Sequence, residues 1–336
     1  LSRDDVERNV EGIRAQLERF LDFKGPNAAT LLNNADWLCE IGLLTFLRDI
    51  GKHFSINMML NRDSVRMRLE DRDHGISYTE FSYILLQSYD FLYLNEKYDC
   101  RLQVGGADQW GNIVSGMDLA RRLRNTSTYG LTFPLVTKAD GSKFGKSEAG
   151  NIWLDAERTS PYRFYQFWMN QADADTGKYL RYFTFLSHAE IDALDQALRD
   201  APEQRLAQKR LAEEVTLLVH GKTALANAQA ASKAMFGGSL NDLDEDTLAD
   251  VFSEVPSAEL ALRHIAGQTP LLDALVEAKV FAGKSEAKRL VRNGGLYLNN
   301  ERIDAEDVRL SEACLLAGRM TVIRTGKKNY HLLKFV

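Results

Sequence analysis

A short segment with two lysines three positions apart and a following hydroxyl offers the clearest chemistry in this sequence. Lys143 and Lys146 are followed by Ser147, and two glycines lie in the same segment. Such a cationic, glycine-containing loop can neutralise the charge that develops on a triphosphate as pyrophosphate leaves. The alternative for a bare Lys-x-x-Lys-Ser pattern is a solvated surface turn. The residues upstream of the loop favour the phosphate interpretation.

A second group of candidate residues lies on one face of an expected helix. Ser77 and Glu80 have the capping-box spacing, which predicts that a helix begins here. Tyr83, Gln87 and Asp90 fall at i, i+4 and i+7, so they share one face of that helix. A polar stripe on an otherwise apolar helix is either a solvent-exposed face or the wall of a binding pocket.

A third group lies in and just after a short predicted strand, residues 101–106, which ends in two glycines. In open α/β sheets, ligands bind at the carboxyl ends of the strands, where glycine lets them approach the backbone. Gln103, Asp108 and Gln109 are therefore placed to hold a nucleotide or an amino acid. The alternative is that Asp108 only caps the helix that it opens.

The elements that must position these residues predict an α/β region followed by helices. Ser2 can cap a first helix, and residues 131–136 predict a buried strand immediately before the two-lysine loop. From Thr159 onward the helical pattern continues for about 75 residues, and Ser187 and Glu190 repeat the capping-box spacing. Residues 237–269 are acidic and irregular, which predicts a linker.

The last 67 residues predict a small basic domain that contains two helices and two hairpins. We expect Ser285 to cap the second helix, which carries the candidate RNA-binding residues Lys284, Lys288, Arg289 and Arg292. Residues 270–336 contain 12 Lys+Arg and 8 Asp+Glu, a net charge of +4, so the preceding residues carry −9 of the total of −5. A basic helix beside a small sheet can follow a phosphate backbone, whereas the alternative is a charged, solvated helix.

The bulk composition indicates a globular protein of two or three domains. The chain has 336 residues, of which 45% are hydrophobic and 26% are charged. No apolar run approaches the ~18 residues that a membrane span needs. Cys39, Cys100 and Cys314 form neither a disulfide nor a metal pattern, which fits a reducing cytosol.

Three stretches together resemble bacterial-type tyrosyl-tRNA synthetases. They are residues 81–90, residues 102–112 and residues 143–147, the last of which matches this family's version of the class I Lys-Met-Ser-Lys-Ser loop. The likeness continues through residues 159–168 to a C-terminal region that is similar to the S4 RNA-binding fold. It covers essentially the whole chain.

The resemblance implies an α/β fold. Residues 1–152 would form the C-terminal half of a Rossmann-type catalytic domain with the phosphate-binding loop. Residues 153–236 would form an α-helical domain on the anticodon side of the tRNA. Residues 237–269 would be the linker, and residues 270–336 an α+β S4-like RNA-binding domain.

The resemblance also implies how L-tyrosine is held. Tyr83 and Gln87 would bind its ammonium group, and Asp90 would accept a hydrogen bond from its phenol hydroxyl. Gln103 and Gln109 would complete the contacts to the amino acid and its carbonyl group. A buried Asp90 without a hydroxyl partner would be left unsatisfied, which would penalise phenylalanine.

The nucleotide would be held by residues at the strand end and in the two-lysine loop. Gly106 and Asp108 would contact the ribose of the adenylate, and Lys143, Lys146 and Ser147 would close over the ATP phosphates. ATP would enter as a substrate with Mg²⁺, and no prosthetic group or protein metal site is expected. Positioning and electrostatics would supply most of the catalysis.

The implied activity is that of a tyrosine–tRNA ligase. It forms tyrosyl-adenylate and pyrophosphate from L-tyrosine and ATP, and then transfers tyrosine to tRNA(Tyr). The implied protein is a cytoplasmic homodimer that binds no membrane, with residues 37–54 as a plausible interface. The alternatives are a non-catalytic RNA-binding descendant of the family and a tryptophanyl-type synthetase. Asp90 on the polar helix face favours tyrosine.

One family motif is not found in the sequence. Class I synthetases carry a His-x-Gly-His motif near the N-terminus, and none of the six histidines stands in that pattern. We therefore expect that the chain lacks the family's first nucleotide-binding half, and that these 336 residues alone do not exchange pyrophosphate into ATP.

Overall fold

The structure, a computed structural model, forms two compact units. It describes residues 2–70, 75–142, 144–147, 150–235, 237–241, 243–253, 255–326 and 329–336. The first unit is Ala29–Phe144, and the second combines Leu1–Ala28 with Gly145–Val336. The predicted catalytic region, residues 1–152, is divided between the two units, because residues 1–28 and 145–152 belong to the second unit.

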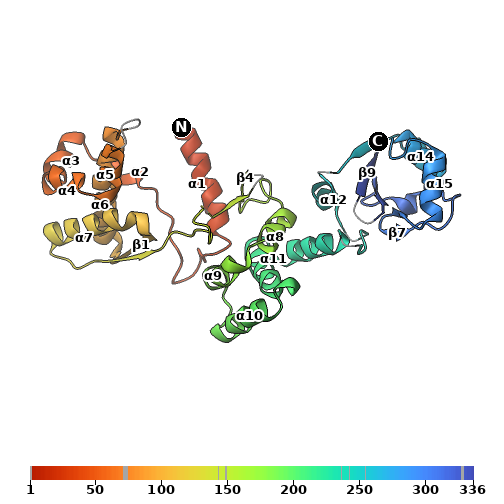
Figure 1. Cartoon of the computed structure of the whole chain (residues 1–336). Helices are drawn as coiled ribbons and strands as arrows, with labels where there is room; N and C mark the ends of the chain where they lie inside the picture. The colour runs from red at the N-terminus through yellow and green to blue at the C-terminus, as the bar shows by residue number, and fades with distance from the viewer. Residues whose placement is uncertain are drawn as a thin grey trace. The chain divides into compact units, whose positions relative to one another are not determined.

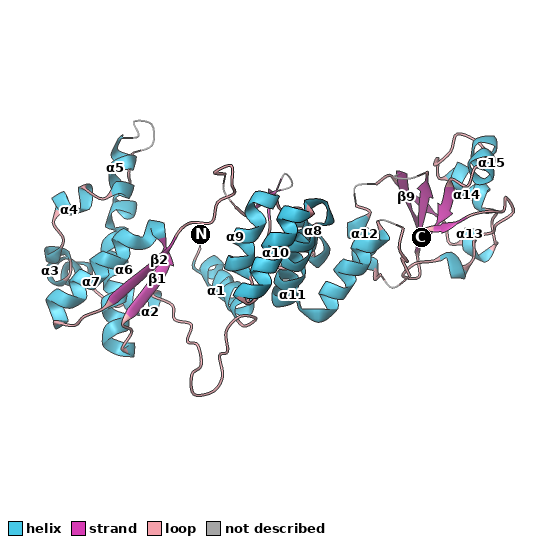
Figure 2. Ribbon diagram, turned by 60° about the horizontal axis from the view of Figure 1, so that its bottom comes forward, coloured by secondary structure: helices cyan, strands magenta, loops and turns pink. Residues whose placement is uncertain are grey.

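The unit Ala29–Phe144 contains a β–α–β arrangement preceded by helices (Figure 1). Its elements are α2 (Ala35–Leu38), α3 (Leu43–Asp49), the 3-10 helix η1 (Gly51–His53), α4 (Ile56–Leu60), α5 (Asp63–Glu70), α6 (Tyr78–Tyr98), β1 (Leu102–Gly106), the 3-10 helix η2 (Ala107–Gln109), α7 (Trp110–Arg124) and β2 (Tyr129–Phe133). Strands β1 and β2 are parallel, with Leu102 opposite Tyr129 and Gly106 opposite Phe133 (Figure 2). The expected α/β fold is confirmed here.

Helix α7 covers one face of the two-stranded sheet. A Cβ atom on Gly130 would lie 2.6 Å from Cγ2 of Ile113, so helix and strand are in close contact there. The other face carries Leu131 and Phe133, which are 46% and 56% exposed. The expectation of a buried strand at residues 131–136 is therefore wrong in its burial and in its bounds, because parallel strands become fully buried only when both faces are covered.

The second unit begins with α1 (Arg3–Leu17) and continues, after two short strands, with a helical region. Its elements up to residue 234 are the strands β3 (Lys146–Ser147) and β4 (Gly150–Asn151), and the helices α8 (Pro161–Met169), α9 (Asp173–Phe183), α10 (His188–Asp200), the 3-10 helix η3 (Pro202–Gln204) and α11 (Leu206–Ala234). Ser2 and Ser187 cap α1 and α10 with complete capping boxes, as predicted. The aromatic rings of Phe164, Trp168 and Tyr179 form the buried centre of this region.

Helix α11 is broken at Gly221, whose backbone has φ +82° and ψ 178°. Only glycine adopts this conformation readily, so the position requires glycine. The break leaves carbonyl groups without helical partners, and the guanidinium of Arg19 donates a 2.9 Å hydrogen bond to one of them, the carbonyl of Val219. This bond ties the segment after α1 to the middle of α11.

The C-terminal part of this unit is built on a five-stranded sheet of order β5-β9-β8-β6-β7. Its elements are α12 (Glu245–Val251), β5 (Ser257–Leu260), α13 (Arg263–Ala266), α14 (Leu271–Glu277), α15 (Lys284–Arg292), β6 (Leu296–Leu298), β7 (Glu301–Arg302), the 3-10 helix η4 (Glu312–Cys314), β8 (Met320–Thr325) and β9 (Asn329–Phe335). The two predicted hairpins are confirmed as the antiparallel pairs β6–β7 and β8–β9.

Two expectations for this region need correction. The predicted linker contains α12 and β5, and β5 pairs in parallel with β9, so it adds a strand to the sheet. Its partner lies more than 70 residues later in the chain, which no local pattern reveals. The predicted cap Ser285 lies inside α15, which begins at Lys284 after the extended residue Gly283.

Within the described part of the chain, none of the helices has both the length and the apolar character that a membrane crossing requires.

His220, next to the break in α11, generates a prediction about pH. Its ring contacts Phe164 edge to face at 4.8 Å, and burial, with the charge of Arg19, lowers its pKa from 6.5 to about 4. Between these two values the unfolded chain binds more protons than the folded chain. Stability from this site is therefore fully present above pH 6.5 and is lost as the pH falls toward 4.

We predict that His220→Phe, which keeps an aromatic ring against Phe164, weakens the fall of the thermal midpoint between pH 6.5 and 4. Circular dichroism measures this midpoint, and His188→Phe, at an exposed position of α10, serves as the control. A pH profile of His220→Phe identical to that of the parent would contradict the prediction.

Candidate functional site

The carboxylate of Asp90 is held between two nitrogen donors. Asp90 lies on α6, whose first turn carries the predicted capping box of Ser77 and Glu80. The indole Nε1 of Trp37 donates a 2.7 Å hydrogen bond to Oδ1 of Asp90, and the amide Nδ2 of Asn34 donates a 3.0 Å bond to Oδ2. A carboxylate has about four lone-pair sites, so it can still accept a hydrogen bond from a hydroxyl group.

This arrangement corrects the expectation that Asp90 is unsatisfied without a phenol. Both of its oxygens already have partners in the chain. The partners precede Asp90 by 56 and 53 residues, so spacing along the sequence could not reveal them. The only available signal was general: a buried tryptophan usually finds an acceptor for its N–H group, and Trp37 is 6% exposed.

The other two residues of the predicted helix face differ in exposure. Tyr83 is 54% exposed, whereas Gln87 is partly buried. Among the described residues, Oε1 of Gln87 and Oε1 of Gln103 are buried acceptors without a hydrogen-bond partner. Buried polar atoms are normally paired, so each of these oxygens is suited to accept a hydrogen bond from a bound molecule.

A second cluster lies where β1 ends. Oδ2 of Asp108 accepts a 2.8 Å hydrogen bond from Nε2 of Gln109, and Oε1 of Gln109 accepts a 3.3 Å bond from Asn112. A Cβ atom on Gly106 would lie 2.5 Å from Oδ1 of Asp108, so a larger residue at position 106 would displace this carboxylate from its present position. Asp108 makes no side-chain cap, because α7 begins at Trp110 and its N-cap residue is Gln109.

The two-lysine loop is described only in part. Lys143 lies outside the described residues, and for Lys146 and Ser147 only the backbone, strand β3, is described. Strand β3 pairs antiparallel with β4, and the carbonyl of Gly145 accepts a 3.0 Å hydrogen bond from the amide of Ile152. The backbone of the loop is therefore a short hairpin, which is compatible with a flap over a ligand.

The predicted RNA-binding residues lie on α15, and three of the four are paired with acids. Lys284 lies 2.6 Å from Asp273, and Glu306 contacts both Lys288, at 3.3 Å, and Arg292, at 2.7 Å. The hydrogen bonds from Arg292 and Lys288 hold the pKa of Glu306 below its usual value. All four side chains are exposed, but these acids reduce the positive field that the sequence predicted.

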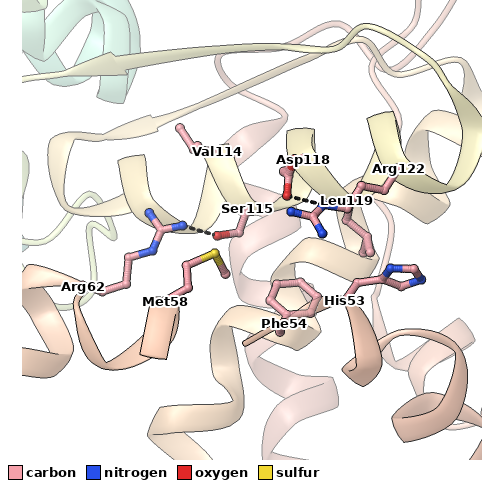
Figure 3. A pocket seen from close by; sticks show the side chains of 9 residues that line it. All are labelled: His53, Phe54, Met58, Arg62, Val114, Ser115, Asp118, Leu119 and Arg122. Atoms are coloured by element: carbon pink, nitrogen blue, oxygen red, sulfur yellow. Dashed lines mark hydrogen bonds and ion pairs between the residues drawn. The ribbon is translucent and has the colours of Figure 1, made fainter. Parts of the chain in front are cut away.

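A separate cavity of about 200 Å³ lies between η1, α4 and α7 (Figure 3). Its wall includes His53, Arg62 and Arg122, and it contains none of the predicted site residues. Arg62 donates a 2.6 Å hydrogen bond to Oγ of Ser115, and Arg122 donates a 2.6 Å bond to Asp118. The two guanidinium groups are thus already paired within the chain.

Metal ligands are also absent as a group: among the described residues, no three His, Cys, Asp or Glu side chains are arranged to hold a metal ion.

Comparison with known proteins covers both units of the chain. Residues 1–237 match the family model of class I tRNA synthetases for tryptophan and tyrosine. Residues 247–333 match the model of the tyrosine--tRNA ligase SYY-like C-terminal domain. The second match begins before β5, in agreement with the strand that the structure places in the expected linker.

Curated relatives are similar along the whole chain. The tyrosine--tRNA ligase of Roseiflexus castenholzii is 54% identical over 340 residues, which cover 100% of this chain and 80% of the relative. That of Geobacillus stearothermophilus is 50% identical over 336 residues, which cover 99% of this chain and 78% of the relative. These relatives favour tyrosine over the tryptophanyl alternative.

A solved structure has the same fold over part of its length. The C-terminally truncated mitochondrial tyrosyl-tRNA synthetase of Aspergillus nidulans matches with a TM-score of 0.56 at 32% identity, over 68% of this chain and 65% of that one. The predicted class I fold and the predicted family are thus confirmed. The chain belongs to the tyrosine–tRNA ligases, which are ATP-dependent class I aminoacyl-tRNA synthetases.

Proposed function

We propose that the face of α6 that carries Tyr83, Gln87 and Asp90 binds L-tyrosine. The observation that carries this proposal is the Asp90 carboxylate, which two N–H donors orient while lone pairs remain for a phenol hydroxyl. The unpaired Oε1 atoms of Gln87 and Gln103 support it, because an ammonium group supplies the donors that such acceptors need. Tyr83 assists Gln87 at the ammonium end, and Gln109 contacts the carbonyl group.

We propose that the strand-end cluster and the two-lysine loop hold ATP, which enters as its Mg²⁺ complex. Gly106 and Asp108 bind the ribose, and Lys143, Lys146 and Ser147 bind the phosphates. A carboxylate oxygen of tyrosine attacks the α-phosphorus, the bond from that phosphorus to the bridging oxygen breaks, and pyrophosphate leaves. The lysines stabilise the charge on the leaving group. A terminal ribose hydroxyl of tRNA(Tyr) then attacks the activated carbonyl, and AMP leaves.

We also propose that the enzyme works as a homodimer in the cytoplasm. Helix α3 buries Phe46 but leaves Leu43 70% exposed and Leu44 82% exposed. Large apolar side chains that are exposed side by side on one helix are typical of an interface. The three cysteines are all free, in keeping with a reducing compartment.

The first prediction from this proposal concerns Asp90. In Asp90→Asn the side chain keeps its shape but loses the charge that strengthens a hydrogen bond from the phenol. We expect the preference for tyrosine over phenylalanine, measured as the ratio of the two kcat/KM values, to fall about 10- to 100-fold.

Asp99→Asn, an exposed change of the same chemistry at the end of α6, is the control and should leave the ratio unchanged. An unchanged ratio in Asp90→Asn would show that Asp90 does not bind the phenol of the substrate. A parent protein that binds tRNA but does not prefer tyrosine to phenylalanine would favour the non-catalytic RNA-binding alternative.

The second prediction concerns α15. Lys288→Ala combined with Arg292→Ala should weaken binding of transcribed tRNA(Tyr) and reduce the slope of log K against log salt by up to about 2, because fewer counterions are released. Filter binding at several salt concentrations measures both quantities.

Arg8→Ala with Lys24→Ala removes the same charge from exposed positions outside the C-terminal region and should retain the parent's slope. If the α15 variant keeps that slope as well, α15 does not bind RNA and is only a charged, solvated helix.

The third prediction concerns the interface. Leu44→Asp places a charge on the exposed face of α3 and should convert the dimer to a monomer in sedimentation equilibrium. Leu262→Asp, at a residue that is 52% exposed in the other unit, is the matched control. A Leu44→Asp protein that remains as associated as the parent would exclude α3 from the interface.

A further inference from the structure

The ring of Tyr93 lies flat against the indole of Trp37. The two ring centroids are 4.6 Å apart, and the planes are inclined by 14°. Tyr93 follows Asp90 by three positions on α6, so the two residues lie on the same side of that helix. Trp37 therefore makes two contacts with α6: its ring stacks on Tyr93, and its Nε1–H donates a hydrogen bond to Asp90.

The segment that carries Trp37 has little structure of its own to fix the indole. Helix α2 has only four residues, Ala35–Leu38, and no side chain caps its N-terminus. So short a helix is not stable by itself and takes its position from tertiary contacts. The contacts with α6, a helix of 21 residues, supply that position.

The same segment supplies the second donor to Asp90. Asn34 is the N-cap residue of α2, and its amide bonds Oδ2 of Asp90 while Trp37 bonds Oδ1. A movement of the indole would therefore disturb both donors together. The ring of Tyr93 also contacts that of Tyr89, at 6.4 Å between centroids, and Tyr89 in turn contacts Phe46 at 5.9 Å.

We propose that Tyr93 is a positioning residue for Asp90, acting through Trp37, and that it sets how strictly the enzyme distinguishes tyrosine from phenylalanine. The inference rests on the proposed role of Asp90 as the acceptor for the phenol. Tyr93 contacts neither substrate nor reacting atoms in this account. Its ring holds the indole in the orientation in which Nε1–H points at Asp90.

The test compares Tyr93→Ala, which removes the stacked ring, with Tyr93→Phe, which keeps it. The first measurement is the tyrosine/phenylalanine ratio of kcat/KM. The second is solvent exchange of the indole N–H of Trp37, one of four indole signals in a ¹⁵N spectrum, assigned with Trp37→Phe. We expect Tyr93→Ala to lower the ratio roughly 3- to 10-fold and to accelerate the exchange, because the stack no longer holds the indole.

Tyr93→Phe should match the parent in both measurements. Leu85→Ala, a buried truncation on the same helix, controls for general destabilisation and should leave the ratio unchanged. The proposal is overturned if Tyr93→Ala leaves the exchange and the ratio at parent values, or if Tyr93→Phe loses as much as Tyr93→Ala. If Asp90→Asn leaves the ratio intact, the proposed role of Asp90 fails, while the exchange of the Trp37 N–H still decides whether the stack holds the indole.

Discussion

The hydrogen bonds that Trp37 and Asn34 donate to Asp90 are the constraint on which the proposed specificity depends. A partly buried carboxylate is costly unless donors compensate for the lost water, and a fixed carboxylate discriminates better than one that rotates. Asn34 and Trp37, which lie in one short segment, compensate the carboxylate for the lost water and also fix its orientation. The two bonds fix the orientation of the Asp90 carboxylate without a substrate, so under the proposed role a phenol hydroxyl would find an acceptor that is already in place.

The surrounding fold makes this geometry stable. Helix α6 is capped at Ser77 and packs on α7. Helix α7 covers the sheet of β1 and β2, and it begins directly after Asp108 and Gln109. The face of α6 that carries Asp90 and the cluster of Asp108 and Gln109 at the end of β1 thus belong to one unit, Ala29–Phe144. The hairpin β3–β4 and helix α15, for which we propose phosphate and RNA binding, belong to the other unit.

The sequence predicted features that depend on neighbouring residues. The capping boxes at Ser77 and Ser187, the face of α6, and the hairpin β6–β7 with its Asn299–Asn300 turn all follow from local spacing. Features that depend on distant partners were missed. These are the donors to Asp90, the pairing of β5 with β9, and the ion pairs of Lys288 and Arg292 with Glu306. Each of them joins segments whose contact no helical or strand period reveals.

The most direct test of the central claim is a crystal structure of the enzyme with bound L-tyrosine. We predict that the phenol oxygen lies within hydrogen-bond distance of a carboxylate oxygen of Asp90, and that the bonds from Trp37 and Asn34 are preserved. A phenol bound elsewhere, with Asp90 bonded only to Trp37 and Asn34, would contradict it.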